Sequence, residues 1–182
     1  MKGFGEVDAS ALRWLPVEGE HPDFQLLAGS EEVARLSWSA GRGSLATGVT
    51  RDASWTFKRA GFLSPHVTAR LVGGTADAAK LSLHWSSSLL EVAGNGTFRL
   101  LRRGTLVPTW EFVDQSGTAV LNEEAVREHS TLVGGLVTVA PKEVARPELP
   151  ILLLTAWYFL VQAWAEEDAA SQTQAALIAT YA

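Results

Sequence analysis

Residues 149–165 read LPILLLTAWYFLVQAWA, an uncharged and almost wholly apolar segment between Glu148 and Glu166. A helix that is apolar on every side must be buried, either inside a protein or in a bilayer. One large apolar side chain contributes about 1.5–3 kcal/mol when it is buried, so about a dozen of them contribute tens of kcal/mol. That exceeds the net stability of a typical domain. We therefore expect this helix to lie at the centre of the fold.

The chain before this segment has the pattern of an antiparallel β domain. Between residues 12 and 139, runs of alternating apolar and polar side chains are separated by turn residues such as Gly73-Gly74 and Gly94-Asn95-Gly96. Alternation places the apolar side chains of a strand on one face of a sheet, and glycine or asparagine permits the positive φ of tight turns. Regular strand-and-turn spacing predicts a barrel or a sandwich. The clearest expected strands are 54–58, 67–72, 81–85 and 109–113.

Two segments depart from this pattern. Residues 122–130, NEEAVREHS, predict a short helix or a polar loop, with Asn122 as a candidate N-cap. Pro147 and Pro150 fall in the first turn of the C-terminal helix, where the missing amide hydrogens would have no partner in any case. We expect a single domain, 1–182, with a β body over 1–145, a buried helix over 147–165 and a polar, alanine-rich tail over 166–182.

The apolar helix could be a membrane span or the filling of the β body. Its 17 uncharged residues cover about 25 Å, which is short of the ~30 Å hydrocarbon core. Thr155 and Gln162 lie on one face, and such a polar stripe is unfavourable against lipid. A closed sheet needs a filled interior, so we expect the helix inside a barrel and not an integral membrane protein; a C-terminal anchor is the alternative. The expected core side chains of the helix are Leu153, Trp157, Leu160 and Trp164.

The chain also resembles a known superfamily. The segment WEFVDQSGTAV (residues 110–120), the β-rich body and the terminal helix LPILLLTAWYFLVQAW together are similar to the tubby-like superfamily, most closely to its LURP-one-related proteins. Tubby C-terminal domains and phospholipid scramblases belong to the same superfamily. The resemblance implies a mainly β fold: a closed antiparallel β-barrel of about twelve strands around a central hydrophobic C-terminal α-helix. Function varies within the superfamily: tubby domains bind phosphoinositides, scramblases are linked to membranes and calcium, and many LURP-one-like members have no assigned biochemistry.

Composition excludes several functional classes. A net charge of −5 and a pI near 5.4 argue against nucleic acid as a partner. The chain has no cysteine and no apolar N-terminal segment typical of a signal peptide, so we expect a cytoplasmic protein, at most peripheral to a membrane. Abundant Ala, Gly, Arg and Leu with few Lys is typical of a GC-rich bacterial genome.

We find no pattern that predicts catalysis or a cofactor. The four histidines, His21, His66, His84 and His129, lack the spacing of metal ligands. No nucleophile elbow, P-loop or dinucleotide-binding motif is present. Adjacent carboxylates such as Glu123-Glu124 are expected at the surface, and the turn at 114–117 has too few carboxylates for calcium. We therefore predict no enzyme activity, no cofactor and no metal.

The candidate binding residues are cations that suit phosphate. Arginine offers a bidentate fork to phosphate oxygens. If Phe98 and Leu100 face inward, Arg99 and Arg103 share the outer face of their strand. The alternative is that these cations are solvated strand ends beside glycine turns. The candidate anion- or headgroup-binding residues are Lys58, Arg59, Arg99, Arg102 and Arg103.

Two functional hypotheses follow from the sequence. The first is a non-catalytic cytoplasmic barrel that binds a phospholipid headgroup, a membrane surface or a protein partner. The second is a helix-grip or calycin-like carrier of a small apolar ligand. A gripping helix keeps one polar face toward solvent, and residues 149–165 have almost none, so the sequence favours the first hypothesis.

Overall fold

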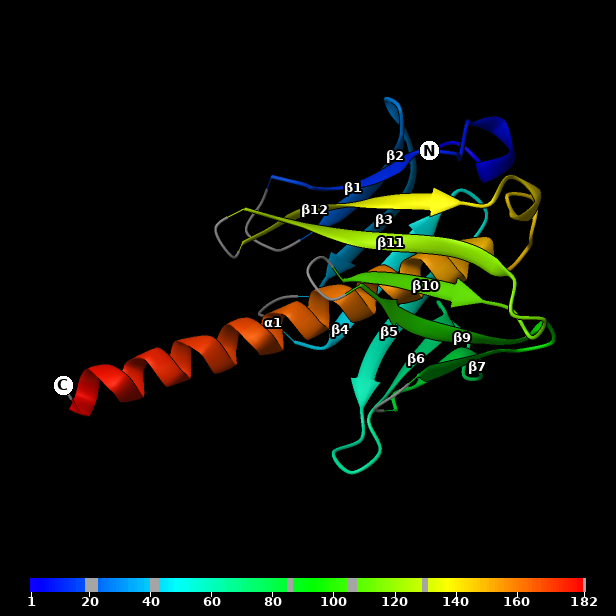
Figure 1. The fold of residues 1–182 in the computed structure, drawn as a ribbon. Helices are drawn as coiled ribbons and strands as arrows, with labels where there is room; N and C mark the ends of the chain where they lie inside the picture. Colours follow the sequence, from blue (N-terminus) through cyan, green and yellow to red (C-terminus); the bar gives the residue numbers. More distant parts are fainter. Residues whose placement is uncertain (19–22, 40–42, 85–86, 105–107, 129–130, 182) are drawn as a thin grey trace.

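The computed structural model describes residues 1–18, 23–39, 43–84, 87–104, 108–128 and 131–181, and for 172–181 it describes the backbone alone. Within these residues, twelve antiparallel strands form one closed barrel, in which β12 pairs with β1 (Figure 1). The strands are β1 (Leu12–Pro16), β2 (Phe24–Ala28), β3 (Glu31–Trp38), β4 (Leu45–Thr50), β5 (Ser54–Ala60), β6 (His66–Leu71), β7 (Asp77–Ser82), β8 (Ser88–Val92), β9 (Gly96–Arg103), β10 (Thr109–Val113), β11 (Ala119–Glu128) and β12 (Thr131–Val139). Two 3-10 helices, η1 (Phe4–Glu6) and η2 (Pro141–Glu143), and one α-helix, α1 (Leu149–Tyr181), complete the fold. The expected closed antiparallel barrel is confirmed.

Helix α1 fills the barrel and then projects from it (Figure 1). Its side chains are buried from Leu149 to Val161, apart from the half-buried Pro150, and Leu153, Trp157 and Leu160 are among them as expected. Trp164 is only half-buried, because the barrel ends near that turn. The helix therefore has a shorter buried part than the predicted 147–165, and the expected tail continues it to Tyr181.

Stacked aromatic rings join α1 to the strands. Trp157 stacks on Trp14 of β1, with ring centroids 5.4 Å apart and planes 8° apart. One residue further along the helix, Tyr158 stacks on Trp38 of β3 at 6.0 Å. Aromatic pairs of this kind contribute about 0.5–1.5 kcal/mol beyond the area that they bury. Trp157 and Tyr158 thus fix the rotation of the helix inside the barrel.

The strands follow the expected alternation of inward and outward side chains. In β9, Phe98 and Leu100 are buried and Arg99 between them is exposed. In β5, Trp55 and Phe57 are buried on the face that contacts α1, and Lys58 is exposed. Only the inward row of each strand has to be apolar, because the outward row faces water.

Two local predictions were wrong. Residues 122–130 were expected to form a helix or loop, yet β11 extends through Glu128 and pairs with β10 and β12 on both sides. Pairing with two neighbours outweighs the weak local preference of a polar sequence. The expected strand at 81–85 ends at Ser82, and Trp85 lies outside the described residues.

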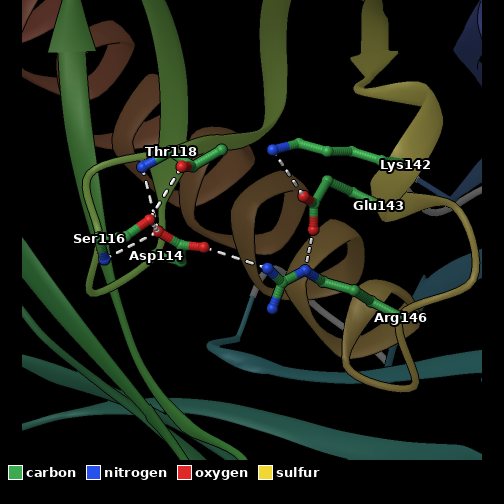
Figure 2. A network of polar contacts seen from close by, with 6 residues as sticks. All are labelled: Asp114, Ser116, Thr118, Lys142, Glu143 and Arg146. Atoms are coloured by element: carbon green, nitrogen blue, oxygen red, sulfur yellow. Dashed lines mark hydrogen bonds and ion pairs between the residues drawn. The ribbon is translucent and has the colours of Figure 1, made fainter.

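A polar network fastens the start of α1 to the barrel (Figure 2). Arg146 contacts the buried Glu143 through Nε. The Nη2 atom of Arg146 lies 3.1 Å from Oδ2 of Asp114 at the β10–β11 turn. Asp114 also accepts hydrogen bonds from Ser116 and Thr118, which organise that turn. These hydrogen bonds, the one from Ser116 first, lower the pKa of Asp114. The network is structural, since its charges pair with one another.

Gly135 permits the close approach of α1 to β12, and its replacement tests the position of the helix. A β-carbon at this residue would collide with the ring of Trp157 and lie 3.0 Å from the Glu124 carbonyl oxygen. We expect Gly135→Ala to lower the free energy of unfolding by about 1–3 kcal/mol through overpacking. Urea unfolding measures the change. Gly5→Ala is the control, because nothing lies within 4 Å of a β-carbon there; equal midpoints for both variants would contradict the packing described.

The apolar part of α1 meets the length and composition of a membrane span. The segment Leu149–Ser171 qualifies, yet 67% of its most apolar window is buried inside the protein. Burial of that extent is the property of a core helix, which satisfies the same criteria. In this structure the barrel supplies the apolar surroundings that the helix requires.

Candidate functional site

The barrel has a distinct end where α1 leaves it, which we call the exit end. Two ion pairs hold the helix there: Arg59 of β5 lies 2.5 Å from Glu166, and Arg127 of β11 lies 3.2 Å from Glu167. Both acids lie in the exposed turn that follows the half-buried residues 162–164 of α1. The exit end therefore brings cations from separate strands around one turn of helix.

The five cations predicted as an anion site do not form one cluster. Lys58 and Arg59 belong to β5, whereas the other three belong to β9, and β6, β7 and β8 lie between these strands. Lys58 is exposed on the outer face, while Arg59 follows the inward row and binds Glu166. These two residues occupy opposite faces of one strand, as the alternation of a strand requires.

The arginines of β9 divide in the same way. Arg99 and Arg103 share the outer face as expected, and Arg103 is paired with Glu111 at 2.9 Å. Arg102 follows the inward row behind Leu100 and reaches the exit end, where it lines a pocket. The predicted cations thus lie at separate places, and Arg102 is the one of the β9 arginines that reaches the mouth of the barrel.

The most exposed apolar side chains of the described chain lie at this end as well. Phe62 and Leu63, in the loop between β5 and β6, are 100% and 91% exposed. The loop is held in shape: Gly61 has a φ of +84°, and a β-carbon there would collide with the Ser64 carbonyl. The backbone amide of Leu83 donates a 3.0 Å hydrogen bond to the Pro65 carbonyl. Phe62 and Leu63 are therefore presented to solvent by an anchored loop.

The segment that contains this loop has more cations than carboxylates, and two of its arginines, Arg59 and Arg70, are paired with Glu166 and Asp77. Residues 53–76, which contain β5, the loop and β6, have Lys58, Arg59 and Arg70 but no Asp or Glu. Over 33–76, six Lys and Arg stand against one carboxylate, a net charge of +5, whereas the remaining nine cations and nineteen carboxylates give −10. Lys58 and Arg59 were predicted from the sequence as binding residues, whereas Phe62 and Leu63 were not. The absence of acids and the adjacent Phe62-Leu63 are the signals that would have indicated this site.

A pocket of about 400 Å³ opens at the exit end beside α1. Its floor is apolar, with Trp110 of β10 and Leu160 and Trp164 of the helix, and its rim carries charged groups. Trp110 packs edge-on against Phe159 at 5.0 Å. The lining residues are Arg102, Pro108, Trp110, Glu124, Ala125, Val126, Arg127, Leu160, Ala163, Trp164 and Glu167.

Glu123 is buried, contrary to the expectation of a surface pair with Glu124. It follows the inward row of β11, is 0% exposed, and accepts a long 3.5 Å hydrogen bond from the Trp14 indole at Oε1. Its Oε2 has no hydrogen-bond partner among the described residues. Burial raises the pKa of Glu123 well above 4.5, and the Trp14 bond opposes that shift only in part. The barrel thus holds one carboxyl group that favours its neutral form.

The described residues contain no group of three or more His, Asp and Glu placed to hold a metal ion. His66 and His84 belong to separate elements, with His66 at the start of β6 and His84 beyond the end of β7, and His21 and His129 lie outside the described residues. Around α1, inward side chains such as Leu26, Leu36 and Phe57 are fully buried.

Comparison with known proteins gives no relative: the chain matches no family model, no curated protein and no solved structure. The resemblance to the tubby-like superfamily therefore stays a prediction.

Proposed function

We propose that the protein is a non-catalytic barrel that binds an anionic lipid surface with its exit end. One observation carries the proposal: Phe62 and Leu63 are almost fully exposed on an anchored loop whose flanking strands have cations and no carboxylate. Exposed apolar groups that serve no packing role mark interaction sites. Basic residues beside them are the pattern of segments that bind the interface of an anionic membrane.

The shape of the loop favours lipid over a protein partner. Phe62 and Leu63 are neighbours in a loop that projects from the barrel, so a rigid protein would need a matching groove to bury both. The fluid hydrocarbon region of a bilayer can surround a protruding loop of any shape. In Figure 1 the loop and the outer part of α1 project in different directions, so the helix does not shield the tip.

Magnitudes indicate weak and reversible binding. Burial of two large apolar side chains contributes about 3–6 kcal/mol. Each cation near an anionic surface adds about 1 kcal/mol, and salt screens this part. Lys58 forms no ion pair among the described residues and is available for it, whereas Arg59 is paired with Glu166. Phe62 and Leu63 alone provide a membrane affinity similar to that of a single lipid anchor, which binds weakly and reversibly. We therefore expect stable binding only where anionic lipid is present.

Co-sedimentation with vesicles tests the proposal. We expect the protein to sediment with vesicles of phosphatidylcholine and phosphatidylglycerol, and much less with phosphatidylcholine alone. The double variant Phe62→Ser, Leu63→Ser loses the free energy gained by burying two apolar side chains in lipid. It should bind the anionic vesicles at least about tenfold more weakly. Because both side chains are exposed, the variant should keep the thermal stability of the original protein.

Val72→Ser is the matched control, since Val72 is also exposed but lies at the other end of β6. A dye attached at Ser64→Cys, the sole cysteine in that variant, should shift to the blue when vesicles are added. Equal binding by the double variant and the control would refute the role of the loop. Sedimentation with neither kind of vesicle would refute lipid binding and direct the search to a protein partner.

A further inference from the structure

Three arginines from separate strands lie near α1 at the exit end, and two of them have a carboxylate of the helix as partner. Arg59 is paired with Glu166, and Arg127 is paired with Glu167 at 3.2 Å. Arg102 of β9 lines the pocket beside the helix, and it forms no ion pair among the described residues. The pocket therefore holds one guanidinium group without a counter-ion in the part of the chain that the structure describes.

Neither glutamate of β11 that is level with Arg102 in the strand register is its partner. Glu124 borders the pocket, but the register places it in the outer row of the barrel wall, opposite Thr109. Glu123 faces inward, but it is fully buried, accepts its hydrogen bond from Trp14 and does not line the pocket. The positive charge of Arg102 is therefore available to a ligand.

The floor of the pocket beside Arg102 is apolar and partly open to water. Trp110 lies directly opposite Arg102 in the register of β9 and β10. Leu160, Ala163 and Trp164 of α1 line the same pocket. The side chains of Trp110, Ala163 and Trp164 are half-buried. A ligand that covers this floor would remove apolar surface from water, which favours binding.

A single cation at the rim of an apolar floor fits an anion that has an apolar body. A guanidinium group binds a carboxylate with two parallel hydrogen bonds. One guanidinium without a counter-ion matches one negative charge on the ligand. The volume of about 400 Å³ lies in the range of small-molecule sites. A hydrocarbon chain can therefore lie on the floor while its carboxylate stays at the rim.

We propose that this pocket binds a small amphipathic carboxylate, such as a medium-chain fatty acid, with the carboxylate at Arg102 and the hydrocarbon chain on the apolar floor. The proposal goes beyond surface binding by the β5–β6 loop and does not depend on it, because different residues form the two sites.

Calorimetric titration of the whole chain with octanoate, below the concentration at which it forms micelles and without vesicles, tests the site. We expect one octanoate per chain. Octanol and octylammonium have the same hydrocarbon chain without the negative charge. They should bind at least about tenfold more weakly, because the charge-assisted hydrogen bonds to Arg102 are lost. Acetate has the charge without the chain and should not bind measurably, since each buried methylene strengthens binding about fourfold.

Variants locate the two halves of the ligand. Arg102→Gln should weaken octanoate binding about tenfold to about 100-fold and leave octanol binding unchanged. Arg102 is exposed, so this variant should keep the thermal stability of the original protein. Arg99→Gln, an exposed outward arginine three residues away on β9, is the matched control and should change neither. Ala163→Trp fills the floor and should weaken both ligands, whereas Ala170→Trp, on an exposed turn of α1, should weaken neither.

The partial ligands separate the alternatives. Octanol that binds as tightly as octanoate would overturn the carboxylate in favour of a purely apolar pocket. Acetate that binds as tightly as octanoate would overturn the amphipathic ligand in favour of a simple anion site. Absence of octanoate binding, or equal weakening by Arg102→Gln and Arg99→Gln, would overturn the site itself. Because no vesicle is present, failure here leaves the lipid-surface proposal standing, and failure of sedimentation leaves this one standing.

Discussion

Trp157→Asp is expected to yield no soluble, folded protein. Trp157 is fully buried, stacks on Trp14 and packs edge-on against Phe24 at 5.3 Å. Truncation of a buried tryptophan costs about 3–5 kcal/mol, and an unpaired buried carboxylate costs several more. The sum is comparable with the whole stability of an ordinary domain, about 5–15 kcal/mol.

Soluble yield, size-exclusion chromatography and near-ultraviolet circular dichroism measure this result. Ala170→Asp is the control, because it places the same carboxylate on an exposed turn of the same helix and should fold normally. Trp157→Phe retains an apolar ring and should be destabilised but folded. A monomeric Trp157→Asp protein with the original near-ultraviolet spectrum would contradict the central position of α1.

Glu123→Gln is expected to remove a large part of the pH dependence of stability. Burial raises the folded-state pKa of Glu123 above its value of 4.5 in the unfolded chain. Between the two pKa values the folded state holds a proton that the unfolded state has released. Stability therefore falls as pH rises above 4.5, by about 1.4 kcal/mol per pH unit for one proton, and it levels off above the folded-state pKa. Glutamine does not ionise, so the variant does not lose stability in this way as the pH rises.

Urea unfolding of both proteins across the pH range from about 4 to about 8 gives the difference in free energy directly. At the acid end the two should be nearly equal in stability, because the protonated carboxyl and the amide have similar size. At higher pH the variant should be the more stable of the two. Glu128→Gln, at the exposed end of the same strand, is the control. A difference between the variant and the original protein that does not change with pH would show that Glu123 is not buried in its neutral form.

The local pattern of the sequence determined the strands and the buried helix. Alternation in 54–58 and 109–113 predicts β5 and β10 because the period of a strand is fixed by its geometry. The uncharged segment 149–165 requires burial, in protein or in a bilayer, and the structure places it at the centre of the barrel. These features depend on neighbours along the chain, and a single sequence contains that information.

The assembly of the candidate sites was decided by the tertiary structure alone. Pairing of β10 with β9 and β11 brings Arg102 and Arg127 to one pocket, although they are far apart in the sequence. The same register turns Glu123 inward, whereas the polar sequence around it gave no sign that this side chain is buried. Charge and polarity along the chain say what a residue can bind, but strand register and the exit of α1 decide which residues meet. The sequence by itself determined an antiparallel β domain and a helix that must be buried, because both follow from local periodicity and apolarity; the packing of distant strands decided which side chains meet at the exit end.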